Sequence, residues 1–141
     1  MTRTALPMFT LALSSLIALG VGCAVLIAPA PFYAINNVSL PDDVSLLNDL
    51  RAFGGGLVAL GLFVATGLVV AAFRLPALVA AALVYAGFGA ARVFALIIDG
   101  VPDPAFIAVL VIELAVAALC LVSTVVAGRM APSWHSGLSP A

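Results

Sequence analysis

Two oppositely charged residues inside apolar stretches are the strongest candidates for chemistry in this chain. Arg92 follows Pro76 by 16 positions, and Glu113 precedes Arg129 by 16 positions. Because a helix rises about 1.5 Å per residue, both charges are predicted about 24 Å from the same membrane edge. A charge at this depth costs at least about 2.5 to 3.5 kcal/mol and typically finds a partner inside the bundle. We therefore expect Arg92 and Glu113 to be in contact.

The Arg92–Glu113 pair has two interpretations. The favoured one is a structural ion pair that fixes the register of two helices. The other is a binding or proton-handling site, because ionisable residues inside a membrane are candidates for function. Glu113 can gain or lose a proton, whereas arginine stays protonated in proteins. With no second titratable partner close in sequence, we predict no catalytic residue and no enzyme.

Other polar residues are predicted in the same half of the membrane. Asp99 lies seven residues beyond Arg92, on the same helical face and two turns outward. Arg51 marks the outer boundary of its own apolar stretch. We predict a small polar cavity that opens to the outer face. Its lining is predicted to be Arg51, Arg92, Asp99 and Glu113, and its rim Asn48, Asp49 and Tyr85.

Glycines near these charges indicate close helix packing. Gly54 and Gly55 follow Arg51 by three and four positions and share its face. Small residues at membrane helix interfaces let two backbones approach closely. We expect Gly54, Gly55, Gly87 and Gly89 to seal the inner half of the bundle. Matching small surfaces in the first apolar stretch are predicted at Gly20, Ala24 and Ala28.

The composition requires an apolar environment for most of the chain. Its 141 residues are 65% hydrophobic and 8% charged, whereas a soluble domain has about a quarter of its residues charged. Four apolar stretches are long enough to cross a hydrocarbon core of about 30 Å. We predict an all-α, four-helix transmembrane bundle. The predicted organisation is a single membrane domain at 1–129, with spans at about 8–28, 53–73, 77–98 and 105–127, and a flexible cytoplasmic tail at 130–141.

The flanking charges predict the orientation. The two termini and the connection between the second and third spans share one side, which carries Arg3, Arg74 and Arg129. The opposite side carries Asp42, Asp43 and Asp103. Because basic residues are enriched in cytoplasmic loops, both termini are predicted to be cytoplasmic. The expected location is a bacterial inner (cytoplasmic) membrane, crossed by a multi-pass chain.

Several site types are not expected from this sequence. His135 is the only histidine, so we predict no histidine-based metal site and no catalytic triad. Cys23 and Cys120 are predicted at depths about 9 Å apart, which does not favour a disulfide. No cofactor signature is present, and a net charge of −1 without a basic run does not favour nucleic acid. The expected partners are the lipid bilayer and another membrane protein or a second copy of this chain.

Three short segments carry a family resemblance. "NDLRAFGGG" (48–56), "ARVFALIIDGVPD" (91–103) and "IEL" (112–114) occur in an order that resembles a family of small four-span bacterial membrane proteins, catalogued only as a domain of unknown function. That family is distantly similar to DoxX-type membrane proteins. The resemblance implies a four-helix membrane fold over about residues 8–127 and assigns no activity. Some DoxX-type proteins are membrane subunits beside quinone-linked oxidoreductases, a role that we transfer to no residue here.

Two function hypotheses are therefore carried forward. The favoured one is a non-enzymatic membrane interaction or accessory protein with a buried Arg–Glu pair. The alternative is a binder or carrier of a small lipid-like or anionic molecule, which would use the polar cavity in the outer leaflet.

Overall fold

The regular structure of the described residues, 4–129, is entirely helical. This computed structural model contains α1 (Ala5–Ile27), α2 (Pro29–Ala34), α3 (Val44–Val69), a 3₁₀ helix η1 (Ala71–Phe73), α4 (Arg74–Ile98) and α5 (Pro104–Gly128). Among these, α1, α3, α4 and α5 form four segments long and apolar enough to cross a membrane, as expected for a multi-pass membrane protein. The predicted tail at 130–141 lies outside the described residues.

Prolines and aspartates set the ends of the helices. The peptide nitrogen of Pro29 has no hydrogen, so α1 ends just before it, and the same proline starts α2 at a position that favours proline. Asp43 caps α3 by accepting hydrogen bonds from the backbone of Ser45 and Leu46. Because of this cap, α3 begins at Val44, before the start of the second predicted span. Asp103 caps α5 in the same way.

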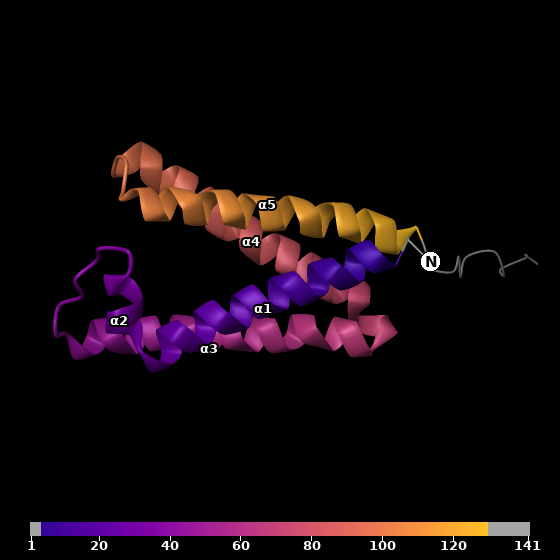
Figure 1. Ribbon diagram of the computed structural model, residues 1–141, viewed down its shortest axis with the longest axis horizontal. Helices are drawn as coiled ribbons and strands as arrows, with labels where there is room; N and C mark the ends of the chain where they lie inside the picture. The colour runs from indigo at the N-terminus through magenta and orange to yellow at the C-terminus, as the bar shows by residue number, and fades with distance from the viewer. Residues whose placement is uncertain (1–3, 130–141) are drawn as a thin grey trace, which may run out of the picture.

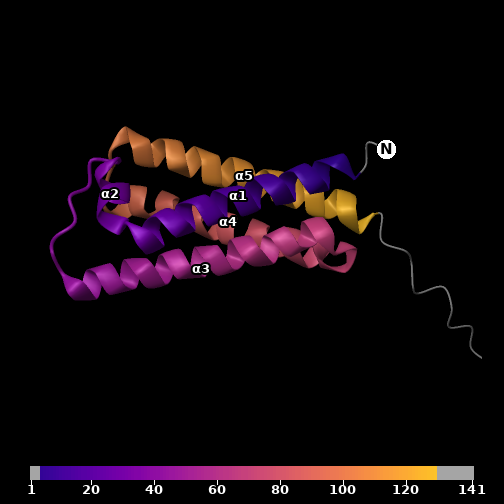
Figure 2. The ribbon, with the colours of Figure 1, turned by 60° about the horizontal axis from the view of Figure 1, so that its bottom comes forward.

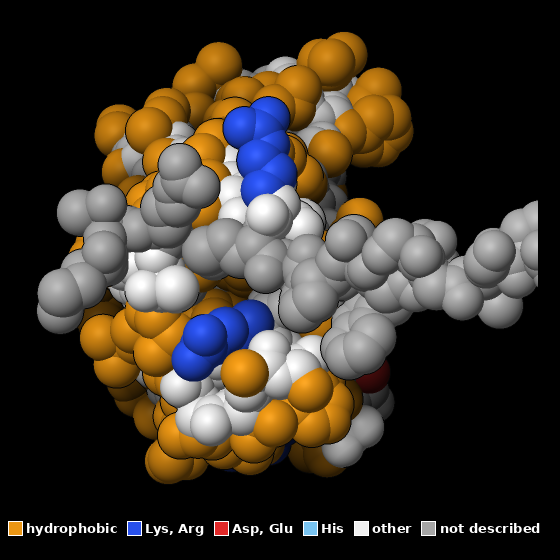
Figure 3. Space-filling view, turned by 90° about the vertical axis from the view of Figure 1, so that its right-hand side faces the viewer, with side chains coloured by type: hydrophobic (Ala, Val, Ile, Leu, Met, Phe, Trp, Pro, Cys, Tyr) orange, Lys and Arg blue, Asp and Glu red, His pale blue; other side chains and the backbone are white. Residues whose placement is uncertain are grey.

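The two ends of the bundle differ in charge. In Figures 1 and 2 the start of α1, the α3–α4 connection and the end of α5 lie together, at the end we call basic because Arg74 and Arg129 flank it. Figure 3 faces this end and shows side chains in the Lys/Arg colour among hydrophobic ones. The other, acidic end holds α2 and the α4–α5 turn. Its aspartates are Asp42, Asp43, Asp49, Asp99 and Asp103, and Arg51 also lies toward this end.

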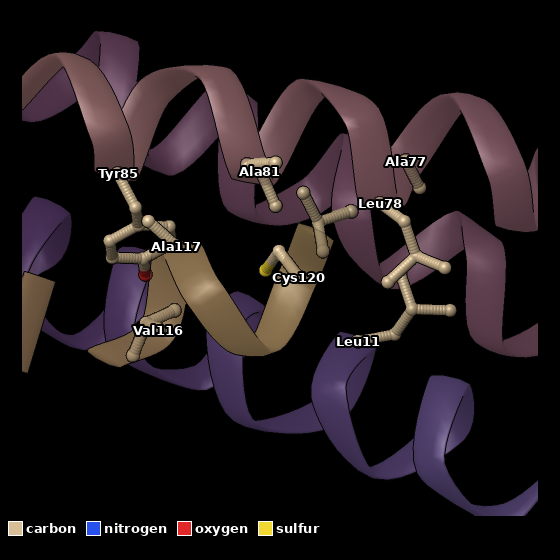
Figure 4. Packing of buried hydrophobic residues seen from close by; sticks show 10 residues of the cluster. Leu11, Ala77, Leu78, Ala81, Tyr85, Val116, Ala117 and Cys120 are labelled. Carbon is tan, nitrogen blue, oxygen red and sulfur yellow. The ribbon is translucent and has the colours of Figure 1, made fainter. Parts of the chain in front are cut away.

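The helices pack as two pairs that converge at the basic end. Helix α1 packs along α3, and α4 packs along α5, while α3 and α5 are not in contact. Figure 1 shows the two pairs diverging toward the acidic end. The core lies in the half near the basic end and is rich in alanine (Figure 4). Its fully buried members include Leu11, Ala77, Leu78, Ala81 and Cys120.

Hydroxyl groups join α1 to α5 within the basic half. The side-chain oxygens of Thr10 and Ser123 are 2.7 Å apart, and both residues are fully buried. Thr10 also donates to the carbonyl of Leu6, one turn earlier, so Ser123 is the donor in the contact between the two hydroxyls. Hydrogen bonds of this kind hold membrane helices together without a hydrophobic driving force.

Close approach of backbones involves only some of the predicted glycines. A Cβ atom on Gly54 would lie 2.6 Å from the backbone nitrogen of Leu26, and one on Gly22 would lie 2.8 Å from that of Val58. Gly55 and Gly87 face open space, and so does Gly20. The expectation that Gly54, Gly55, Gly87 and Gly89 seal the inner half is wrong. Gly54 closes the α1–α3 seam near the acidic end, Gly89 packs on Leu114, and the alanine-rich core closes the basic half.

Candidate functional site

The predicted contact between Arg92 and Glu113 is present. Nε of Arg92 on α4 donates to Oε2 of Glu113 on α5 over 2.7 Å. Glu113 is buried, and the Arg92 side chain is 34% exposed. The short turn between the two helices makes them antiparallel neighbours, so residues at equal depth face each other. Among the described residues this is the only ion pair.

A cavity of about 420 Å³ lies beside this pair, in the half of the bundle near the acidic end. Sites for small molecules commonly have volumes of about 300 to 1,000 Å³ and mostly apolar walls. All four long helices and α2 contribute to the wall. The lining residues are Ile17, Ala18, Val21, Val25, Phe32, Tyr33, Asn36, Phe53, Leu57, Tyr85, Phe88, Arg92, Phe106, Val109, Ile112 and Glu113.

Aromatic rings form much of the cavity wall. Phe53 of α3 and Phe88 of α4 meet edge to face, with ring centroids 5.6 Å apart. The guanidinium of Arg92 lies over the ring of Phe106, 5.7 Å from its centroid, within the range of a cation–π contact. These contacts fix the position of the arginine, because its Nε is hydrogen-bonded to Glu113 and the face of its guanidinium packs on the ring of Phe106.

A second, smaller cavity of about 240 Å³ lies toward the α4–α5 turn. Arg92 and Phe106 line both cavities and therefore form part of the partition between them. Asp99 lines only the smaller one and is exposed. The predicted single cavity is thus two spaces, and Asp99 does not share one with Glu113.

Arg51 lies away from both cavities. Its Nη1 donates to the carbonyl oxygens of Leu26 and Ile27 at the end of α1. The carbonyl of Ile27 would normally accept from the residue four positions later, but that residue is Pro31, which has no amide hydrogen. Arg51 supplies this missing donor, and its positive charge is favourable at the C-terminal end of a helix. The predicted cavity position of Arg51 is corrected to this capping position.

The three predicted rim residues are placed differently from one another. Asn48 and Asp49 are exposed on the first turns of α3 and line neither cavity. Tyr85 is only 5% exposed and lies deep in the cavity wall rather than at a rim. Its hydroxyl donates to the backbone carbonyl of Ser14 on α1 over 2.8 Å. The orientation of α4 that places Arg92 in contact with Glu113 also directs the Tyr85 side chain toward the core.

The aromatic residues of the cavity wall were missed by the reasoning from sequence. Phe88 lies three residues after Tyr85 and four before Arg92, a spacing that places all three on one helical face and could have indicated it. Phe32 and Tyr33 come from α2 and also line the cavity. No group of three His, Cys, Asp or Glu side chains within residues 4–129 is suited to hold a metal ion.

A side-chain hydrogen bond connects the two helix pairs at the acidic end. The Asn37 amide, in the segment between α2 and α3, donates to Oδ2 of Asp103 over 3.0 Å. Asn37 has a φ of 58°, a left-handed conformation that asparagine tolerates better than most residues. The backbone hydrogen bond from Ala105 lowers the pKa of Asp103, and the Asn37 amide lowers it further. Asp103 is therefore both the cap of α5 and a link to the segment between α2 and α3.

Comparisons with known proteins support a family assignment. No curated protein and no solved structure matches the chain. A family model, described as a domain of unknown function (DUF4345), matches residues 8–124, which include all of the cavity-lining residues. This chain therefore belongs to the DUF4345 family, a domain of unknown function.

Proposed function

We propose that this protein is a non-enzymatic, multi-pass membrane protein that binds a small lipid-like molecule in the larger cavity. The supporting observation is the combination of an apolar, aromatic wall with one charged pair at its edge. An apolar pocket with a few convergent polar groups is typical of small-molecule sites. The cavity therefore favours the alternative function over the accessory-protein hypothesis, for which the described residues offer no comparably specific feature.

The proposed orientation places the basic end in the cytoplasm. Arg74 and Arg129 lie at that end, and arginine is enriched on the cytoplasmic side of membrane proteins. The cavity then lies in the outer half of a bacterial cytoplasmic membrane, where a lipid-like molecule has direct access from the outer leaflet. A distant relationship to DoxX-type proteins, which the sequence motifs suggest, is part of the same proposal.

The geometry around Glu113 supports a binding role rather than catalysis. Its Oε2 accepts a hydrogen bond from Nε of Arg92, so one carboxylate oxygen is held in an ion pair. The other titratable side chains in the cavity wall are Tyr33 and Tyr85, and the Tyr85 hydroxyl donates to the backbone carbonyl of Ser14.

Photolabelling in lipid nanodiscs tests the binding proposal. The probe is dodecanol with a diazirine near the middle of its chain, and labelled peptides are mapped by mass spectrometry. We expect labels on cavity residues such as Leu57 and Phe88, in addition to lipid-facing residues such as Leu62. Labels on Leu62 alone would contradict the proposal.

Two valines on α5 provide a matched pair of variants for the same experiment. Val109 lines the cavity, whereas Val111 is 60% exposed on the outside of the bundle. Val109→Phe fills the cavity and should remove the labels on Leu57 and Phe88. Val111→Phe adds the same volume outside and should leave them unchanged. Equal labelling of the cavity in both variants would argue against occupancy of this space.

A further inference from the structure

We infer that the larger cavity selects an uncharged lipid-like molecule, with a hydroxyl, carbonyl or ester head that contacts the Arg92–Glu113 pair. This inference rests on the proposed function and names the ligand class for the same site. It narrows the earlier hypothesis of a small lipid-like or anionic molecule to an uncharged one. It follows from the net charge of the cavity, the unused hydrogen-bonding atoms of the pair, and the apolar remainder of the wall.

The cavity wall carries no net charge. Arg92 and Glu113 are the only ionisable residues in its lining apart from Tyr33 and Tyr85, and they neutralise each other over 2.7 Å. Asp99 lines the other cavity. A ligand with a fixed charge would bring an unpaired charge into a low-dielectric space, where its desolvation has no compensating partner.

The pair still offers hydrogen-bonding atoms to a neutral head. A guanidinium has five N–H donors, and the bond to Glu113 uses only the one on Nε. Within the described part of the chain, neither Nη atom of Arg92 makes a hydrogen bond, and Oε1 of Glu113 accepts none. A carbonyl oxygen can accept from Arg92, and a hydroxyl can also donate to Glu113. An uncharged oxygen-bearing head thus uses both partners without disturbing their charge balance.

The shape of the site places the apolar part of the ligand. The side of the cavity away from the pair is formed by aliphatic and aromatic side chains, including Val21 and Val25 of α1 and Phe53 of α3. Their contacts favour a hydrocarbon chain or ring through burial of apolar area. The head therefore lies at the α4–α5 side and the apolar part against α1 and α3.

Photolabelling with matched probes tests the charge selection. Three dodecyl probes carry the same diazirine and differ only in the head, which is a hydroxyl, a sulfate or a trimethylammonium group. Both ionic heads keep their charge at every pH used. In nanodiscs of phosphatidylcholine, labelling of Phe88 is divided by labelling of lipid-facing Leu62 to correct for membrane partitioning. We expect this ratio to be at least about tenfold higher for the alcohol, because either ionic head would bring an uncompensated charge into the cavity.

Two variants change the net charge of the cavity and should therefore change which probe gives the highest labelling ratio at Phe88. Glu113→Gln leaves Arg92 uncompensated, so the sulfate probe should now give the highest ratio at Phe88. Arg92→Gln leaves Glu113 uncompensated, so the trimethylammonium probe should give the highest ratio. Val111→Phe, on the outside of the bundle, is the control and should keep the preference for the alcohol.

The possible results separate this inference from the proposed function. Equal ratios for the three heads in the unmodified protein would overturn charge selection while leaving binding intact. A higher ratio for either ionic head would overturn it as well. Labelling confined to Leu62 with every probe would overturn both proposals. The three-probe comparison in the unmodified protein gives this answer even where a variant fails to fold.

Discussion

Tyr85 of α4 donates its hydroxyl hydrogen to the backbone carbonyl of Ser14 on α1, over 2.8 Å. This bond crosses the bundle diagonally at the boundary between the alanine-rich core and the larger cavity, to both of which Tyr85 belongs. It therefore joins the two helix pairs at the level where they begin to diverge.

We expect Tyr85→Phe to lower the free energy of unfolding by about 0.6 kcal/mol, the average for hydrogen bonds between membrane helices. Tyr33→Phe is the matched control, because the Tyr33 hydroxyl makes no hydrogen bond within the described residues. Unfolding of both variants in bicelles by titration with sodium dodecyl sulfate measures the difference. Equal stability of the two variants would mean that the bond to Ser14 contributes nothing.

Breaking the Arg92–Glu113 pair from one side should destabilise the bundle. Arg92→Met or Glu113→Leu alone leaves an uncompensated charge, with an expected loss of about 3 kcal/mol, the lower end of the range for buried pairs. The lower end applies because the Arg92 side chain is 34% exposed. The double variant should recover most of this loss. Thermal unfolding in detergent measures all three, and single variants as stable as the double one would contradict the prediction.

Adjacent glycines of α3 should respond differently to the same substitution. Gly54→Ala places a methyl group against the backbone of Leu26 and forces α1 and α3 apart, with an expected loss of about 1 to 3 kcal/mol. Gly55→Ala adds its methyl group in open space and should be neutral or slightly stabilising. Unfolding by sodium dodecyl sulfate compares the two. Equal losses would contradict the tight α1–α3 seam.

The contact between Arg92 and Glu113 could be predicted because two opposite charges at equal depth in an apolar bundle favour contact with each other. The rise per residue of a helix gives the depth of each residue from its sequence position with little error. Residues at the same depth on two adjacent antiparallel helices lie next to each other. The choice between Gly54 and Gly55 could not be made in this way. Successive residues are turned by about 100° around a helix, so the contact depends on the direction of the partner helix. The position of that partner is set by the whole bundle.

The larger cavity lies in the half of the bundle where the intramembrane charges were predicted to gather, but part of its wall was not predicted. No helix was predicted between the first two spans, although Pro29 at the first position of α2 is compatible with a short helix. Arg51 was assigned to the cavity from its depth. Arg51 instead binds the carbonyl oxygens at the end of α1. The sequence alone does not show which of these two positions the side chain takes.

Cysteine labelling should report the proposed orientation. In a background with Cys23→Ser and Cys120→Ala, a cysteine introduced by Ser39→Cys lies at the acidic end and should react from outside the cell. A cysteine introduced by Ala72→Cys lies in η1 at the basic end and should react only after permeabilisation. Both positions are exposed. The opposite pattern would reverse the proposed orientation.

Acidification should weaken the link between Asn37 and Asp103. The hydrogen bonds from Ala105 and Asn37 lower the pKa of Asp103 from its usual value of 3.8 in the folded protein. Its stabilising contribution is therefore complete above pH 3.8 and is lost as the pH falls through the lower folded value. Asp103→Asn should flatten this acid dependence, whereas Asp42→Asn should not. Unfolding measured between pH 5 and pH 2, a range that brackets ordinary carboxyl values, gives both curves.

Helix α2 forms part of the wall of the larger cavity at the acidic end. Its six residues contribute Phe32 and Tyr33 to that wall, and it packs on α1 and α3. The segment that follows it is joined to the start of α5 by the side-chain hydrogen bond from Asn37 to Asp103. Local opening of such a small element costs far less than separating two long helices. If the cavity binds a molecule as proposed, motion of this short helix would widen the acidic end of the cavity while the four long helices keep their packing.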